Sequence, residues 1–463
     1  MTLRKGSTIE LTISGMAYGG QGIARVNGLV IFVRGGVPGD KLRVRVYRKK
    51  KNHIEAGIEE ILIPSPDRIN PMCPYSPYCG GCQWQHIRYE KQLTYKKAHV
   101  VDSIQRIAGL KNVLIRDVVP SESVFEHRNK MEFSFSARRW FLPEEMDLRK
   151  NLGEFALGLH IPGTYFKVID IEACMLQNRR GNQILSEVKK YVKGSNMPLY
   201  DLRGQNGFWR FLTLRYSKAF NEWMVNIVTS EDRKDIVQPL SDILSDKMGD
   251  IGTIVNNINS RRASIAIGEH EKFLFGKGYI YDKIGPFTFQ ISSNSFFQTN
   301  TPTAEKLYNQ VADYAELKGN ETIFDLYSGT GTISIFLADK AHVITGMEIG
   351  KSAVEDACNN CSINSIHNCD FVCGDIRDSL STISESPDVV ITNPPRAGMH
   401  RDIIQQILTL SPRKIIYISC NPPTLARDIK MLSDNYELIE IQPFDMFPHA
   451  YHIESVAKLC LRN

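Results

Sequence analysis

Two patterns of hydrophobic and polar residues divide the chain into three parts. Over residues 7–63, apolar and polar residues alternate in short runs separated by glycine turns, a pattern typical of strands with one buried face. Asn27-Gly28 stands between "GIARV" and "LVIFV" and predicts a tight hairpin. Short, evenly spaced strands of this kind predict a small OB-like β-barrel over residues 1–64.

From about residue 286, apolar runs of strand length instead alternate with stretches of helix length. "ETIFDLY", "HVITGMEI", "CDFVCGD", "PDVVITN" and "RKIIYIS" predict successive strands, and "ISIFLADK", "SAVEDACNNCSIN" and "RDIIQQILTL" predict the helices between them. This alternation predicts an α/β fold, with a Rossmann-like doubly wound sheet over residues 286–463. Residues 65–285 would then form a mixed α+β central domain, in which "YEKQLTYKKAHVVDSIQRIAG" predicts a helix ended by Gly109.

Positive charge is concentrated near the N-terminus. The chain has a net charge of +5, yet residues 1–70 alone hold twelve Lys/Arg against six Asp/Glu, a net charge of +6. In "KLRVRVYRKKK" the basic residues alternate with apolar ones, so one face of the predicted strand is cationic. This distribution indicates a polyanionic partner, most simply a nucleic acid. A solvated charged surface is the alternative.

No apolar run is long enough to cross a bilayer, and the start, "MTLRKGSTIELT", lacks the apolar core of a signal peptide. We therefore expect a cytoplasmic protein with no membrane partner, and we expect a monomer. In that compartment its ten cysteines are expected to be free thiols, metal ligands or nucleophiles, not disulfides.

A nucleoside site is predicted where the first strands of the C-terminal part end. Gly329 and Gly331 lie in a strand-to-helix turn, and Glu348 ends the next strand nineteen residues after Gly329. Such a carboxylate can accept hydrogen bonds from both ribose hydroxyls. Ser334 replaces the third glycine of a dinucleotide fingerprint, which favours S-adenosylmethionine over a pyrophosphate ligand. Asp375 at the following strand end could accept from an adenine amino group; either carboxylate could instead cap a helix.

A cysteine stands at the end of a later strand. In "YISCNPPTLARDI", Cys420 follows a hydrophobic run, and Pro422 and Pro423 prevent the strand from continuing. Beside a methyl donor, a thiolate that adds to C6 of uracil would convert C5 into a carbon nucleophile, and a general base would then remove the C5 proton. The alternative is a small buried packing residue.

Asn393-Pro394-Pro395 at another strand end raises a second possibility. It resembles the motif with which amino-methyltransferases bind a base amine. Those enzymes place an aromatic residue after the prolines, where this chain has Arg396. Methylation of an exocyclic amine is therefore the weaker interpretation.

Four segments together carry a family resemblance. "SCNPPTLARDI", "DLYSGTGTISI", "SFFQTN" and "FPHAYHIESVAKL" resemble motifs of the RNA uracil-C5 (5-methyluridine) methyltransferases, and the N-terminal part resembles their TRAM domain. The resemblance spans essentially the whole chain. It implies Cys420 as nucleophile, Glu454 as the base that takes the C5 proton, and Phe296 against the target uracil. It also implies an S-adenosylmethionine site formed by Gln298, Tyr327, Glu348, Asp375 and Asn393.

One position departs from the family. The family has aspartate where this chain has Asn393, and an amide keeps the hydrogen bonds of that position but loses its charge. With its TRAM domain and cysteines, the chain resembles enzymes that act on 23S ribosomal RNA. Ribosomal RNA is therefore expected as the substrate before transfer RNA, and a non-catalytic RNA-binding factor is the alternative from another class.

The other cysteines form two groups. Cys73, Cys79 and Cys82 lie in a proline-rich loop as C-x5-C-x2-C, and Cys174 could complete a set of four. The spacing allows zinc or an iron–sulfur cluster, and the family resemblance implies [4Fe-4S]. A second group could be mistaken for another metal site, but its spacing on a predicted helix favours packing: Cys358, Cys361, Cys369 and Cys373.

The target uridine must be unpaired or flipped out, because C6 is inaccessible inside a duplex. The basic strand at residues 43–51 would contact phosphates. Arg128 and Lys130 are further candidates for the RNA-facing surface, with structural ion pairing as the alternative.

Overall fold

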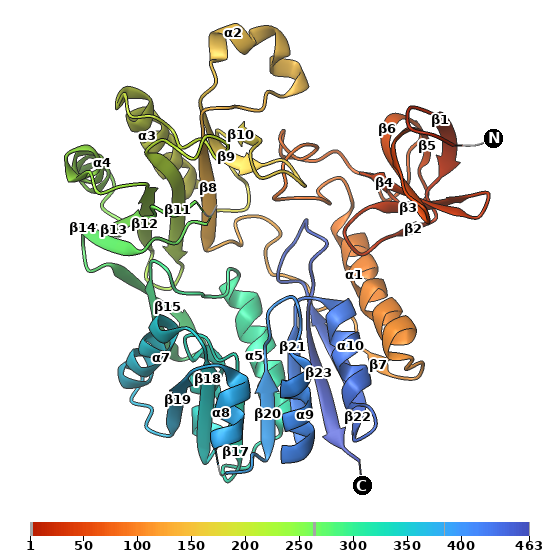
Figure 1. The fold of residues 1–463 in the computed structure, drawn as a ribbon, viewed down its shortest axis with the longest axis vertical. Helices are drawn as coiled ribbons and strands as arrows, with labels where there is room; N and C mark the ends of the chain where they lie inside the picture. Colours follow the sequence, from red (N-terminus) through yellow and green to blue (C-terminus); the bar gives the residue numbers. More distant parts are fainter. Residues whose placement is uncertain (1–2, 263–264, 384, 463) are drawn as a thin grey trace.

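The computed structural model describes residues 3–262, 265–383 and 385–462. In these residues the strands form three large sheets and one separate hairpin. Figure 1 shows the N-terminal sheet, the middle sheet and the C-terminal sheet as three bodies around a common centre.

The N-terminal sheet is a small barrel. Its order is β1-β5-β6-β4-β3-β2, with β1 (Thr8–Thr12), β2 (Gly15–Met16), β3 (Gly22–Val26), β4 (Leu29–Arg34), β5 (Lys41–Lys49) and β6 (His53–Ile63). The chain from β1 to β2 pairs first with β5 and then with β3, which closes the barrel. Asn27 and Gly28 both have positive φ (50° and 80°), as a type I′ turn requires, so the predicted hairpin is confirmed. Leu42, Val44 and Val46 point into the core.

The middle sheet has the order β10-β9-β8-β11-β12-β13-β14. Its strands are β8 (Lys130–Ser136), β9 (Ala156–His160), β10 (Val168–Asp170), β11 (Trp209–Ser217), β12 (Glu222–Thr229), β13 (Ile251–Ile258) and β14 (His270–Phe275). Helices α3 (Arg179–Gly194) and α4 (Lys234–Lys247) bury their apolar faces against it. A short 3-10 helix (Pro143–Leu148) and α2 (Arg149–Leu152) lie between β8 and β9, and the hairpin β15 (Tyr279–Ile284)–β16 (Phe287–Ser292) follows β14.

The C-terminal sheet contains all five strands predicted for the doubly wound domain. Its order is β19-β18-β17-β20-β21-β23-β22-β7. The strands are β17 (Thr322–Leu326), β18 (Val343–Glu348), β19 (Cys369–Cys373), β20 (Val389–Thr392), β21 (Lys414–Ser419), β22 (Tyr436–Phe444) and β23 (Glu454–Leu461), with β7 (Leu114–Ile115) at the edge. β17 to β21 are parallel, and β23 is antiparallel to β21. The predicted Rossmann-like fold class is confirmed.

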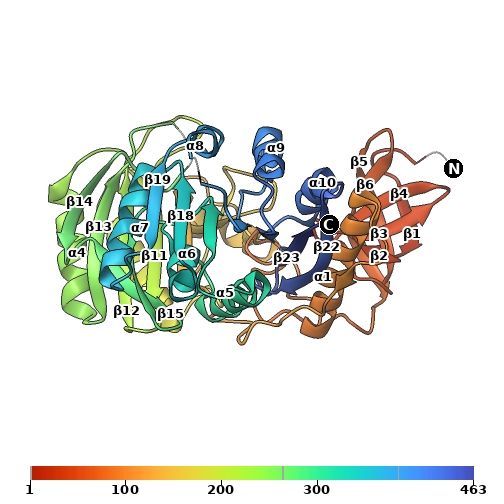
Figure 2. The same ribbon diagram turned by 90° about the horizontal axis from the view of Figure 1, so that it is seen from below.

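Helices cover both faces of this sheet, as Figure 2 shows. One face carries α5 (Thr301–Ala315), α6 (Thr332–Leu337) with its 3-10 extension (Ala338–Lys340), and α7 (Lys351–Ile363). The other carries α8 (Ile376–Thr382), α9 (Arg401–Leu410) and α10 (Pro422–Leu432). Two apolar cores result, one on each side of strands that are themselves buried, as expected for parallel strands.

Part of the chain expected in the central domain packs with the C-terminal sheet. Helix α1 (Tyr89–Ser103) continues as a π-helical turn to Ala108, and Gly109 ends it with φ 79°, as predicted. α1 packs against α10, and β7 adds to the sheet edge beside β22. The range 65–285 therefore includes residues that belong to the C-terminal core.

A buried ion pair anchors the loop between β22 and β23. Lys96 Nζ lies 2.5 Å from Asp445 Oδ1, both side chains are fully buried, and Nζ also donates to the carbonyl of Phe447 (2.9 Å). Gln92 accepts from the backbone N–H of His449 (3.0 Å). Removal of one partner of such a pair costs about 3–5 kcal/mol, so α1 fixes this loop firmly.

In the described part of the chain, none of the helices has both the length and the apolar character needed to cross a membrane.

Candidate active site at the carboxyl edge of the C-terminal sheet

The predicted site residues follow strands whose carboxyl ends share one edge. Tyr327 follows β17, Glu348 ends β18, Asn393 follows β20 and Cys420 follows β21. β17 and β20 are neighbours, and chain order reverses between them. Ligands of open α/β sheets bind in the crevice at such a reversal.

The antiparallel strand β23 brings Glu454 to the same edge. Ser419 pairs with Ser455 at the end of the β21–β23 ladder. Cys420, one residue beyond the end of β21, therefore stands opposite Glu454, the first residue of β23. Pro422 begins α10 directly after the cysteine, which ends the strand as predicted. The structure thus brings together the two residues predicted to carry the chemistry.

Burial controls the protonation of this pair. Glu454 is only 8% exposed, and burial raises the pKa of its carboxyl to about 8, against the opposing effect of Arg396. Burial and the neighbouring Glu454 raise the pKa of the Cys420 thiol, while Arg396 lowers it by charge and hydrogen bonding. The carboxyl therefore holds its proton at neutral pH when the site is free of RNA.

Arg396 connects the loop after β20 to residues that follow β21. It follows β20 in "TNPPRAG", and its carbonyl oxygen accepts from Asn421 Nδ2 (2.8 Å) and Thr424 Oγ1 (3.2 Å). Its guanidinium lies 3.5 Å from His452 Nε2. Arg396 is thus a cation held beside both a thiol and a carboxyl.

The turn after β17 fits a nucleoside ligand. Tyr327 and Gly329 have positive φ (63° and 55°), and a Cβ at Gly329 would meet open space. The carboxylate of Glu348 accepts from the backbone N–H groups of Gly329 (3.1 Å) and Gly350 (2.8 Å). The backbone is therefore accessible, and a fixed carboxylate stands beside it.

Asp375 and Asn393 make different structural hydrogen bonds. Asp375 caps α8 by accepting from the backbone N–H of Arg377 (2.9 Å), and the Arg377 guanidinium lowers the pKa of Asp375 to about 2. Asp375 therefore caps a helix, as the alternative interpretation expected. It also follows β19, so it lies at the same edge of the sheet as the other site residues. The backbone N–H of Asn393 donates to Leu326 O (3.2 Å), which joins the two strands that flank the reversal.

The loop before α5 carries the predicted uracil-contacting and cofactor residues. Phe296 is 68% exposed at this loop, and Thr330 of the glycine turn donates to its carbonyl oxygen (3.5 Å). Gln298 is buried, and its backbone carbonyl oxygen accepts from Asn129 Nδ2 (2.8 Å). An exposed aromatic ring therefore stands beside the nucleoside turn.

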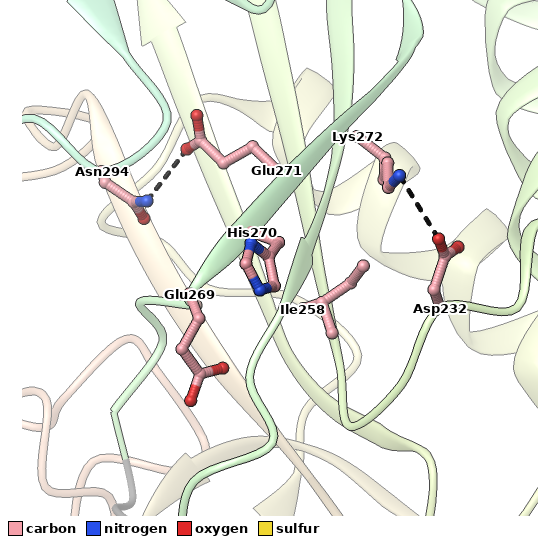
Figure 3. A pocket seen from close by; sticks show the side chains of 8 residues that line it. Asp232, Ile258, Glu269, His270, Glu271, Lys272 and Asn294 are labelled. Atoms are coloured by element: carbon pink, nitrogen blue, oxygen red, sulfur yellow. Dashed lines mark hydrogen bonds and ion pairs between the residues drawn. The ribbon is translucent and has the colours of Figure 1, made fainter.

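Two strands of the middle sheet, β11 and β14, hold this loop in place. Arg215 on β11 is fully buried and donates to the carbonyl oxygen of Ser295. Figure 3 shows Glu271 on β14 bonded to Asn294 (2.9 Å) over a hollow beside that strand. None of the predicted catalytic or cofactor-binding residues lines the hollow. Of the strand residues that line it, Glu271 holds the loop through Ser293 and Asn294.

The four cysteines predicted to bind a metal line one pocket: Cys73, Cys79, Cys82 and Cys174. Cys79 Sγ accepts from the N–H of Gly81 (3.3 Å), and Cys82 Sγ accepts from Gln85 Nε2 (3.2 Å). Burial raises the pKa of Cys79 and Cys82 to about 12. Across the described residues, no three metal-binding side chains surround a single ion position, either here or in the second cysteine group. The four thiols therefore line a common pocket but do not converge on one ion position.

The cationic strand of the barrel is partly neutralised. Arg43 contacts both Glu10 (3.0 Å) and Glu60, and Arg45 lies 3.6 Å from Glu59. These side chains are largely exposed, and exposed ion pairs are weak. The arginines can therefore exchange carboxylates for phosphates, but the face is less positive than its sequence indicates.

The two further RNA candidates lie deeper. Lys130 on β8 is mostly buried beside Arg215, and burial lowers the pKa of its ammonium to about 8. Arg128 lies close enough to the cysteine pocket to influence Cys79. Neither position decides between a structural role and contact with RNA.

Comparison with known proteins places this geometry in a family. The family model described as tRNA (Uracil-5-)-methyltransferase matches residues 234–461, and the TRAM domain model matches residues 3–57. Uncharacterized RNA methyltransferases from Chlorobaculum tepidum and Porphyromonas gingivalis are each 38% identical over 98% of this chain, and over 96% and 100% of their own lengths. The structure of the Pyrococcus abyssi tRNA (uracil-54, C5)-methyltransferase in complex with S-adenosyl-L-homocysteine matches with a TM-score of 0.77 and 30% identity, covering 97% of this chain and 100% of that one.

The chain belongs to the RNA uracil-5 methyltransferase family. As a family member with an N-terminal TRAM domain, it binds RNA and carries out S-adenosylmethionine-dependent methylation of uracil at C5. The predictions of family, fold class and enzyme class are confirmed. Neither amine methylation through Asn393-Pro394-Pro395 nor a non-catalytic RNA-binding role is retained.

Sequence reasoning missed one residue of this uracil-5 methyltransferase site. In the sequence, Arg396 stands out only as the residue that replaces an aromatic side chain in an amine-binding motif. Its position gives only a weak signal, because Arg396 lies four residues after the end of β20. Its partner Glu454 is distant in sequence and reaches that edge only through the antiparallel strand.

The buried carboxyl predicts an unusual pH dependence of stability. Between pH 4.5 and about 8 the unfolded chain ionises Glu454 while the folded protein keeps it protonated, so this residue makes the folded state less stable as pH rises through that window. Glu454→Gln does not titrate. Its melting temperature relative to wild type should therefore rise from pH 5 to pH 8 and then level off. Thermal unfolding across this range measures it, with Glu437→Gln on the exposed side of β22 as control. A difference that does not change with pH would contradict the buried state of Glu454.

Proposed function

We propose that this enzyme methylates C5 of uridine in ribosomal RNA through a covalent bond between Cys420 and C6 of the target uracil. The observation that carries the proposal is the register of β21 and β23, which sets the thiol beside a buried carboxyl. Both stand at the edge that also holds Glu348 and the open glycine turn.

The proposed reaction begins and ends with the Cys420 thiolate. The Cys420 thiolate forms a bond to C6, and the electron pair of the C5–C6 double bond moves toward C5. C5 then bonds to the methyl group of the sulfonium donor. Glu454 removes the remaining C5 proton, the double bond returns, and the C6–S bond breaks to release the Cys420 thiolate. The net products are 5-methyluridine, the demethylated donor and one proton.

The residues around this pair have distinct proposed roles. Arg396 stabilises the thiolate, because it is the cation that lowers the thiol pKa. Phe296 stacks against the target base, which its exposure beside the nucleoside turn supports. We assign the donor site to Gln298, Tyr327, Glu348, Asp375 and Asn393. Asn393 would donate or accept hydrogen bonds there without adding charge.

We assign a [4Fe-4S] cluster to the four cysteines of the pocket, Cys73, Cys79, Cys82 and Cys174. The supporting observations are the buried position of three of these thiols and the N–H donors to Cys79 and Cys82. When bound, the cluster would supply a rigid cross-link between the proline-rich loop and the middle sheet.

Three functional units follow from this assignment. We propose that residues 1–64 bind RNA phosphates, that 65–285 hold the cluster and support the Phe296 loop, and that 286–463 carry the chemistry, in a cytoplasmic monomer. Ribosomal RNA is preferred because the cysteine pattern and TRAM domain resemble 23S ribosomal RNA enzymes. Transfer RNA is the second candidate, favoured by the whole-chain similarity to the Pyrococcus abyssi enzyme.

Mapping of 5-methyluridine decides between the two substrates. Total RNA from cells with and without this gene should differ at one or more uridines of 23S ribosomal RNA, and purified enzyme should restore those marks in RNA from the deletion strain. Loss confined to transfer RNA would replace the ribosomal substrate. Unchanged 5-methyluridine in both, with no transfer in vitro, would contradict the function itself.

Two variants separate the covalent steps. Cys420→Ala removes the nucleophile and should abolish methyl transfer while S-adenosylmethionine still binds, as equilibrium dialysis can measure. Glu454→Gln should form the adduct but release it slowly, so a denaturation-resistant RNA–protein band should accumulate. Cys358→Ala, which changes an exposed cysteine on α7, is the matched control. Methylation by Cys420→Ala would refute the covalent route, and rapid turnover without adduct in Glu454→Gln would refute the assigned base.

Chemical analysis tests the cluster. Protein purified without oxygen should contain about four iron and four sulfide per chain and a broad visible absorption. Cys82→Ser should lose both, while Cys358→Ser should keep them. One zinc per chain with no iron would show that the pocket holds a different metal.

A further inference from the structure

The tip of one barrel hairpin reaches the reaction edge. The loop between β2 and β3 turns tightly, with Ala17 N–H bonded to Gln21 O (2.8 Å) and Gly20 N–H bonded to Ala17 O (3.0 Å). Gly19 and Gly20 both have positive φ (110° and 84°). This turn presents Tyr18 outward from the barrel.

The loop is fixed to the catalytic part of the molecule. Trp84 Nε1 donates to Gly20 O (3.2 Å), and His99 Nε2 lies 3.2 Å from Met16 O. A Cβ at Gly20 would lie 3.2 Å from both Trp84 and Tyr451. The barrel is therefore seated closely on α1 and on the loop that precedes β23.

Tyr18 lies where this loop meets the thiol and carboxyl. Its ring contacts those of Tyr451 (5.7 Å between centroids, 86°) and His99 (5.8 Å, 87°), both edge to face. The Tyr451 ring in turn lies 4.2 Å from that of His452, whose Nε2 is 3.5 Å from the Arg396 guanidinium, so Tyr18 stands at the end of a chain of contacts that leads to the reaction edge. The charges of Cys420, Glu454 and Arg396 affect its hydroxyl. The side chain is 37% exposed, so a ligand at this edge can reach it.

The chemistry of the phenol suits a hydrogen-bond donor at this position. Burial and nearby groups, Tyr451 and Cys420 among them, raise the pKa of Tyr18, so the hydroxyl keeps its proton. When a thiolate adds to C6 of a pyrimidine, negative charge moves onto the ring and its carbonyl oxygens. A fixed O–H donor beside that ring stabilises the charge where it develops.

We propose that Tyr18 completes the pocket for the flipped-out base and donates a hydrogen bond to a carbonyl oxygen of the target pyrimidine. The inference rests on the proposed covalent function of Cys420. It gives the N-terminal barrel a part in the chemical step in addition to RNA binding.

Tyr18→Phe is the sharpest test, because it keeps the ring that contacts Tyr451 and removes only the hydroxyl. With deletion-strain total RNA as methyl acceptor, kcat should fall on the order of 10- to 100-fold, while KM for RNA changes less than about twofold. The rate of adduct formation with 5-fluorouridine-containing ribosomal and transfer RNA transcripts should fall in parallel. The melting temperature should stay at the wild-type value.

Two controls separate this role from docking or RNA affinity. Tyr165→Phe removes another exposed phenol, on the middle part of the chain, and should leave kcat unchanged. Arg48→Ala on the exposed end of β5 should raise KM at low salt and less so at high salt, with little change in kcat. Wild-type kcat and adduct rate in Tyr18→Phe, or a change in KM alone, would overturn the assignment. If the wild type itself forms no adduct, the covalent function falls, and this inference falls with it.

Discussion

The antiparallel pairing of β23 with β21 is the constraint on which the reaction centre depends. Parallel strands by themselves bring Tyr327, Glu348 and Cys420 to one edge, but they provide no carboxyl next to the thiol. The ladder from Lys414–Cys460 to Ser419–Ser455 sets Glu454 opposite Cys420. Since side chains alternate across a strand, a slip of one residue would turn Glu454 to the opposite face of the sheet. The buried Lys96–Asp445 pair fixes the loop that leads into β23, so the register and the entry to the strand are determined together.

The distance along the chain between contacting residues explains which features the sequence could predict. The five parallel strands, the Asn27-Gly28 turn and the strand end at Cys420 are encoded by short stretches of pattern, and each lies where it was expected. The addition of α1 and β7 to the C-terminal core is different, because β7 pairs with a strand more than three hundred residues later. No local pattern records such a pairing. The role of Arg396 could not be predicted for the same reason, because it depends on Glu454, which lies on another strand.

The glycine turn and the Phe296 loop show how the middle part of the chain contributes without joining the chemistry. Arg215 and Glu271 hold the loop from the middle sheet, and Asn129 holds Gln298. On the opposite side, the barrel reaches the edge through its β2–β3 loop. Three bodies that are separate in sequence therefore meet at one strand edge. In the proposed reaction, a base that enters there would lie within reach of residues from all three bodies.

Charge balance at this edge suggests an order for the proposed steps. Among the described residues, Arg396 is the cation that acts on both Cys420 and Glu454, and one positive charge in a buried site favours one anion beside it. With Glu454 protonated, the thiolate is that anion and can attack. Once sulfur is bonded to C6 it is neutral, and methyl transfer consumes the charge that passed onto the ring. Glu454 can then release its proton to solvent, become the anion beside Arg396 and take the C5 proton. Breaking of the C6–S bond returns the charge to sulfur with Glu454 again protonated. A carboxyl with a pKa near 8 is suited to this alternation, because a fully ionised glutamate would oppose the first step and a permanently neutral one would prevent the last.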